Sequence, residues 1–100
     1  MKVKIHELAV AEFDEAIKWY ELQSQGLGKR FEKTVIKQIK KIKKNPKWYL
    51  IEAENIYKAY VPKFPYKILY TIEDNKIIVV WAIAHMHRKP WYWQSRMINE

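Results

Sequence analysis

The chain has 100 residues and a formal net charge of +8, with 49% hydrophobic and 30% charged residues. This length suits a single domain over residues 1–100, with a radius of about 13 Å, and the composition excludes a disordered chain. The lack of cysteine excludes disulfides and thiolate metal sites, and two glycines are too few for a glycine-rich phosphate loop, so we expect no cofactor.

The longest run of apolar residues, Ile77–Ala84, is far shorter than the roughly 20 residues that a membrane-spanning helix needs. The first residues, Met1–Ile5, alternate between polar and apolar side chains and lack the apolar centre of a signal peptide. We therefore expect a cytoplasmic protein with no membrane association.

The beginning of the chain predicts a strand and a helical hairpin. Lys2–His6 alternates with a period of two, which is typical of a half-buried strand. Leu8–Gln23 carries an apolar stripe at helical spacing, although no good capping residue precedes it. This stripe consists of Ala9, Phe13, Ala16, Ile17 and Tyr20. Two glycines, Gly26 and Gly28, then mark a short connection between antiparallel helices.

The second helix begins at Leu27 or Gly28 and ends at Asn45, because Pro46 disfavours the helical conformation of the residue before it. Its apolar side chains lie on one side: Leu27, Phe31, Val35, Ile39 and Ile42. Its basic side chains fill most of the other side: Lys29, Arg30, Lys33, Lys37, Lys40, Lys41 and Lys44. Such a surface favours a polyanionic partner, and a solvated lysine face that keeps the protein soluble explains it equally well.

The second half of the chain predicts strands at Asn55–Val61, Tyr66–Ile72 and Ile77–Ala84. A polar turn, Glu73–Lys76, joins the last two into a hairpin, and the last strand is apolar enough to be central and buried on both faces. The sequence thus predicts an α+β fold with the order β-α-α-β-β-β. An N-terminal strand precedes an antiparallel helical hairpin, which packs on one face of a small, mainly antiparallel sheet.

Several segments together resemble the RelE/ParE toxin superfamily, which includes plasmid stabilisation proteins. They are Trp19-Tyr20, the Gly26-Leu-Gly28 break, the helix end at Asn45-Pro46, Phe64-Pro-Tyr-Lys-Ile-Leu-Tyr70, and Ala84-His85 followed by Arg88-Lys-Pro-Trp-Tyr-Trp93. The resemblance runs from residue 3 to about residue 96, and the predicted element order agrees with that family's fold.

The resemblance implies the toxin of a type II toxin–antitoxin pair, which a cognate antitoxin neutralises by wrapping a segment around it. RelE-like members enter the ribosome and cut mRNA without a metal, whereas ParE-like members block DNA gyrase without catalysis of their own. The target is therefore either the ribosome with its mRNA or DNA gyrase. The sequence leaves the oligomeric state open.

Metal-independent RNA cleavage needs a general base, a general acid and cations that stabilise the charge developing on the phosphate. The resemblance places Lys67 at a catalytic arginine position and Tyr92 at a tyrosine that stacks on a base. His85, His87 and Arg88 follow the last strand, where side chains leave the sheet and can meet a substrate. These residues are the candidate catalytic group. Each also has a purely structural alternative: a histidine at the end of a strand for His85, an exposed turn for His87 and Arg88, and an exposed sheet face for Lys67.

Two positions depart from the RNA-cleaving members. Met86 stands where they carry a second arginine, and Lys67 lacks the two-pronged phosphate contact of an arginine. A plain basic module that binds RNA or an acidic protein is a third hypothesis. His85 and His87 are spaced like a zinc pair, but the sequence offers no obvious further ligands, so we expect no metal site.

A second group of residues has the chemistry for nucleic-acid binding. Its basic and aromatic members are Lys58, Lys63, Lys89, Trp91 and Trp93. The lysines are suited to holding phosphates, and the two tryptophans to stacking on bases. Packing over the sheet, or contact with the antitoxin, is the alternative for these aromatic side chains.

Overall fold

The computed structural model describes residues 1–98 of the chain. This part forms five strands and three helices. In chain order they are β1 (Lys2–Ile5), α1 (Glu7–Gln23), α2 (Leu27–Lys44), β2 (Leu50–Ala53), β3 (Ile56–Tyr60), β4 (Tyr66–Glu73), β5 (Ile77–His85) and α3 (Gln94–Ile98). The radius of gyration is 13.1 Å, close to the value expected for one domain of this length.

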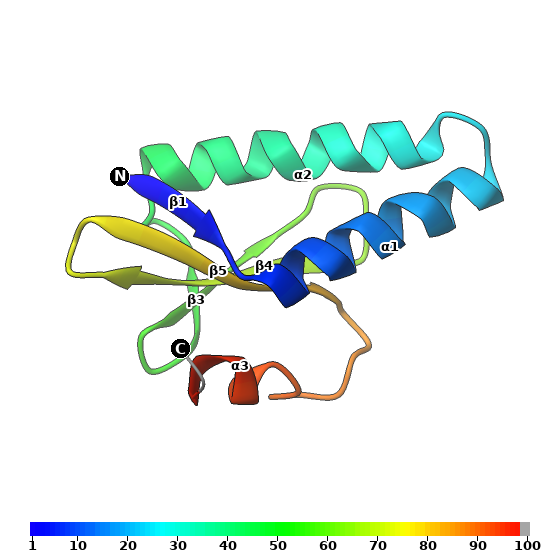
Figure 1. Cartoon of the computed structure of the whole chain (residues 1–100). Coiled ribbons are helices and arrows are strands. Elements are labelled where there is room, and N and C mark those ends of the chain that lie inside the picture. Colours follow the sequence, from blue (N-terminus) through cyan, green and yellow to red (C-terminus); the bar gives the residue numbers. More distant parts are fainter. Residues whose placement is uncertain (99–100) are drawn as a thin grey trace.

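The five strands form one sheet in the order β1-β5-β4-β3-β2. The edge strand β1 runs parallel to β5, and the other neighbours are antiparallel. The helices α1 and α2 lie on one face of this sheet and the short α3 lies on the other (Figure 1). The predicted α+β fold, with a helical hairpin on one face of a mainly antiparallel sheet, is thus confirmed.

Three local features differ from the prediction. The strand β2 and the helix α3 were not predicted; both are short, and β2 exposes its apolar residues Leu50 and Ile51. The first helix does have a cap, because Nδ1 of His6 accepts a hydrogen bond from the Leu8 amide at 3.1 Å. Histidine is an uncommon cap, so the sequence pattern did not indicate it.

The hydrophobic residues divide between the two faces of the sheet. On the hairpin side, the apolar face of α2 is buried through Phe31, Val35 and Ile42, and its lysines are exposed. Phe31 contacts the rings of Tyr20, Phe64 and Tyr66, each at 5.0 Å between centroids. On the α3 side, a smaller cluster consists of Ile56, Leu69, Ala82, Ala84 and Trp93. The strand β5 is buried on both faces, as predicted.

The two helices of the hairpin are in close contact at Gly28. A Cβ atom on Gly28 would lie 2.4 Å from the Ile17 carbonyl oxygen, which is backbone and has no room to move aside. The Gly28 amide also donates to Oε1 of Glu21 at 3.0 Å. This position therefore requires glycine because of the close contact between helices, and not because of its backbone angles.

We expect Gly28→Ala to lower the free energy of unfolding by about 1–3 kcal/mol, since the added methyl group must push α1 and α2 apart. Urea unfolding followed by circular dichroism measures this loss. Lys29→Ala is the control, because Lys29 is exposed on the same turn of α2. Equal stability of the two variants would contradict the close approach.

Candidate functional site

The edge of β5 changes partner halfway along its length. The strand β1 pairs with β5 only over Ile77–Val80, and the next contact is a hydrogen bond from the His6 amide to the Val80 carbonyl at 2.9 Å. Beyond this point β5 presents backbone groups on that edge without a strand beside them, and such groups need other partners.

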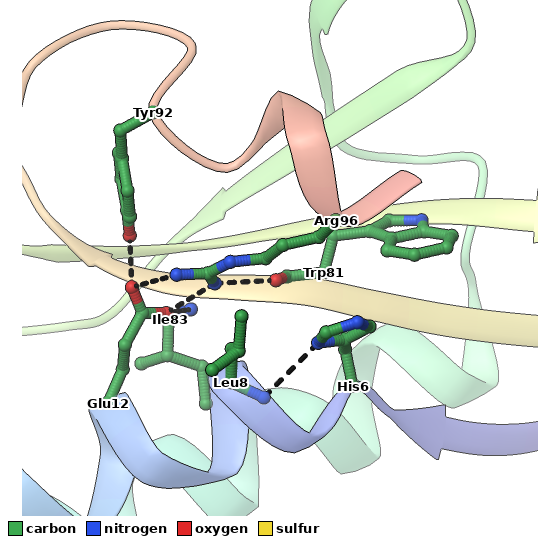
Figure 2. Close-up of polar contacts among 7 residues, drawn as sticks. All are labelled: His6, Leu8, Glu12, Trp81, Ile83, Tyr92 and Arg96. Carbon is green, nitrogen blue, oxygen red and sulfur yellow. Dashed lines mark hydrogen bonds and ion pairs between the residues drawn. The ribbon is translucent and has the colours of Figure 1, made fainter. Parts of the chain in front are cut away.

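Side chains from both ends of the chain supply these partners. Oε1 of Glu12, on α1, accepts a hydrogen bond from the Ile83 amide at 3.1 Å, and Nη1 of Arg96, on α3, donates to the Trp81 carbonyl at 2.9 Å (Figure 2). The two side chains also bind each other through two contacts of 3.0 and 2.9 Å. Tyr92 completes this network by donating its hydroxyl to Oε2 of Glu12 at 2.5 Å.

The network is shielded from water, since the side chains of Glu12 and Arg96 are only 14% and 9% exposed. Burial, the hydrogen bond to Glu12 and the charge of that carboxylate together raise the pKa of Tyr92 well above its usual value. Burial opposes the charge on Arg96, but its contacts with Glu12 outweigh this effect and raise its pKa. The network therefore keeps Arg96 charged and Tyr92 neutral at neutral pH, and it ties the C-terminal segment to α1.

A second buried phenol, Tyr70, provides a test of stability against pH. Its hydroxyl donates to the Pro46 carbonyl at 2.6 Å, and burial raises its pKa far above its usual value, with smaller contributions from Tyr49 and Tyr57. The unfolded chain releases these protons at about pH 10, whereas the folded chain retains them.

We therefore expect the free energy of unfolding to fall as pH rises above about 10, by up to about 1.4 kcal/mol per pH unit for Tyr70. Urea unfolding between neutral pH and pH 11 measures the slope, and Tyr70→Phe should make it shallower. A wild-type stability that stays constant over this range would be the contrary result.

A cleft of about 240 Å³ lies between α1 and the ends of β4 and β5. It is lined by Glu12, Glu15, Ala16, Trp19, Tyr66, Ile83, His85, Arg88 and Tyr92. The Tyr66 and His85 rings meet edge to face at 5.2 Å, and the guanidinium of Arg88 lies 3.9 Å from the centre of the Tyr92 ring. The cleft thus brings together three of the predicted catalytic residues.

His87 lies beside this cleft and is exposed. Its amide donates to Nδ1 of His85 at 3.1 Å, and the two rings are 5.2 Å apart. Because Nδ1 accepts this bond, a neutral His85 carries its proton on Nε2. Residues 1–98 contain no group of three or more histidine or acidic side chains arranged to hold a metal ion.

Lys67 lies on the other face of the sheet. In the β4–β5 register Tyr66 is opposite His85 and Lys67 is opposite Ala84, and successive residues of a strand point to opposite faces. Tyr66 belongs to the hairpin-side core, so Lys67 faces the α3 side together with Ala84 and the cluster around Trp93. The expectation that Lys67 and His85 share one site is therefore wrong.

The two lysines on that face already share a counter-charge. Glu52, on β2, lies 3.2 Å from the ammonium group of Lys67 and 3.4 Å from that of Lys58. Burial opposes the charge on Lys58, but the hydrogen bond and charge of Glu52 outweigh it, so its pKa is raised. These two lysines hold a carboxylate, and a phosphate would have to compete with it.

The remaining predicted residues are spread over the surface and the core. Trp93 is 2% exposed and packs against the sheet, which is the packing alternative, so its ring is not available to stack on a base as its assignment to the nucleic-acid-binding group requires. Trp91 is 47% exposed beside it, and Lys89 is exposed in the preceding turn. Lys63 lies apart from all of these, on the connection between β3 and β4 next to α2.

Comparison with known proteins identifies the family and the structures that share this fold. The model of the family "ParE toxin of type II toxin-antitoxin system, parDE" matches residues 3–90. A comparison with curated proteins found no significant match. No helix within residues 1–98 combines the length and the hydropathy that a membrane span requires.

Two solved structures have the same fold. A chain of the chromosomal ParDE system from P. aeruginosa aligns with a TM-score of 0.74 and 15% identity over 87% of this chain and 97% of that one. The isolated E. coli RelE toxin aligns with a TM-score of 0.63 and 16% identity over 99% of this chain and 98% of that one. At this level of sequence identity, the two structural matches show only that the fold is shared. The family is shown by the family model, which matches residues 3–90. The chain belongs to the ParE toxin family of type II toxin–antitoxin systems.

Proposed function

We propose that the protein is a growth-inhibiting toxin, neutralised by a cognate antitoxin, that acts by binding DNA gyrase and does not cut RNA. The observation that carries this proposal is the separation of Lys67 from His85. One lies on the α3 side of the sheet, paired with Glu52, and the other lies in the cleft on the hairpin side.

Metal-independent RNA cleavage requires a base, an acid and a cation within hydrogen-bonding distance of the same phosphate. Here the sheet separates the cation expected from the resemblance, Lys67, from the imidazole of His85. The phenol of Tyr92 is also occupied, because its hydroxyl donates to Glu12. A toxin that works by binding its target needs no such convergence, so the geometry favours the ParE-like activity.

One observation favours the alternative, a RelE-like nuclease. The cleft holds an imidazole, a guanidinium and a carboxylate, from His85, Arg88 and Glu15, within one concavity. A nuclease built on these groups would not use Lys67. A nuclease would therefore need the side chains of the cleft for activity, whereas a gyrase-binding toxin would need only its outer surface.

Induced expression of the chain in a bacterial host tests both possibilities. We expect growth arrest, relief of the arrest when the antitoxin encoded beside the toxin is expressed, and the same arrest by Lys67→Ala/His85→Ala. A harmless double variant at equal protein level would support the nuclease and contradict the proposal. A harmless wild-type chain would support the basic binding module.

A further inference from the structure

A second polar pocket lies on the basic side of the molecule, away from the cleft around His85. Its volume is about 250 Å³, and it is formed between α2 and the connection from β3 to β4. Three lysines contribute to its wall, Lys37 and Lys41 from α2 and Lys63 from the connection. Lys37 and Lys41 are one helical turn apart, so their side chains are neighbours on the helix surface, roughly 5–6 Å apart at Cβ.

The connection that carries Lys63 is held firmly. The Gln38 side chain, buried in α2, donates to the Tyr60 carbonyl at 2.9 Å, and the Val61 amide donates to the Tyr66 carbonyl at 2.9 Å. Lys63 itself has φ of 68°, in the left-handed region that non-glycine residues rarely adopt. The backbone thus fixes Lys63 opposite the two lysines of α2.

These three lysines differ from the other lysines that the sequence suggested for phosphate binding. Within residues 1–98, none of the three takes part in a described ion pair, whereas Lys58 and Lys67 share Glu52. The segment that carries Lys37 and Lys41 is also poor in anions, because residues 27–45 hold eight basic side chains and only one acidic one, Glu32. The pocket therefore has three positive charges and no carboxylate to balance them.

We propose that Lys37, Lys41 and Lys63 form a phosphate-binding pocket that holds the backbone of a nucleic acid. Lysine binds phosphate as a compact point charge, which suits contacts without sequence specificity. The positive surface continues beyond the pocket along α2 through Lys33, Lys40 and Lys44, which fits a polyanion better than a single small anion. This inference is independent of which target the toxin inhibits.

The test is fluorescence anisotropy with two labelled probes, a short duplex DNA and a single-stranded RNA, at several salt concentrations. The variant Lys37→Gln/Lys41→Gln/Lys63→Gln removes three charges from the pocket. Lys18→Gln/Lys47→Gln/Lys76→Gln is the matched control, because it removes three charges from exposed positions elsewhere and also lowers the net charge from +8 to +5. A variant with arginine at all three pocket positions keeps the charge, and circular dichroism confirms that each variant is folded.

We expect the pocket variant to bind the preferred probe on the order of a hundredfold more weakly near 0.1 M salt. The slope of log K against log salt concentration should become shallower by about 2–3, because each lost phosphate contact accounts for roughly 0.7–0.9. The control should lose much less, and the arginine variant should retain binding. The probe that the wild-type chain binds more tightly identifies the nucleic acid. Equal losses in pocket and control variants, no binding of either probe, or equal competition by polyglutamate would each overturn the proposal.

Discussion

Glu12→Ala is expected to lower the free energy of unfolding by about 3–5 kcal/mol, because it leaves the buried guanidinium of Arg96 without its counter-charge. The same change removes the acceptor of the Ile83 amide and of the Tyr92 hydroxyl. A loss of this size is a large fraction of the roughly 5–15 kcal/mol that stabilises a domain. Urea unfolding at neutral pH measures it.

The control is Glu15→Ala, which removes an exposed carboxylate from the next turn of the same helix and should change stability by less than about 0.5 kcal/mol. The double variant Glu12→Leu/Arg96→Met should recover part of the loss, because an apolar pair no longer buries an unmatched charge. Similar stabilities for Glu12→Ala and Glu15→Ala would show that the network contributes little.

Phe31→Ala is expected to lower the free energy of unfolding by a similar amount, about 3–5 kcal/mol. Phe31 is completely buried and contacts Tyr20, Phe64 and Tyr66, so it joins α2 to α1 and to the sheet. A cavity at this position removes contacts that neighbouring rings are too rigid to replace. Because Tyr66 also lines the cleft, the substitution should loosen His85 as well.

Phe31→Leu is the matched variant, since it keeps an apolar side chain and should lose less than half as much. Thermal unfolding with aromatic circular dichroism follows both the stability and the order of the ring cluster. A loss below about 1 kcal/mol for Phe31→Ala would mean that the rings close the cavity, which contradicts rigid packing of the cluster.

The main elements follow from the sequence because their periodicity is strong. The amphipathic pattern of α2 and the apolar run of β5 indicate directly which side chains are buried in the fold. The strand β2 was missed because it has only four residues and is stabilised by pairing with β3, a contact that no local pattern records.

The arrangement of the site was harder to predict, for reasons of strand geometry. Whether Lys67 shares a face with His85 depends on the β4–β5 register, and this register shifts between Leu69 and Tyr70. A shift of one residue turns the side chains of a strand to the other face, and the sequence does not encode it locally.

The role of Glu12 has only a weak signal in the sequence. At 100° per residue it lies about 40° beyond Ala16, just outside one edge of the buried stripe of α1. A carboxylate at the edge of a buried stripe can still reach water, so the helical pattern alone does not require a cation there. Nor does the pattern identify Arg96, which is 84 residues away and reaches Glu12 only because α3 returns to the sheet.

The most direct test of the proposed function is a DNA supercoiling assay with purified gyrase, run beside an mRNA-cleavage assay in a purified translation system. We predict that the wild-type chain and Lys67→Ala/His85→Ala inhibit gyrase at the same concentration and that neither cuts mRNA on the ribosome. Cleavage of mRNA by the wild-type chain that is lost in the double variant, with gyrase unaffected, would contradict the account.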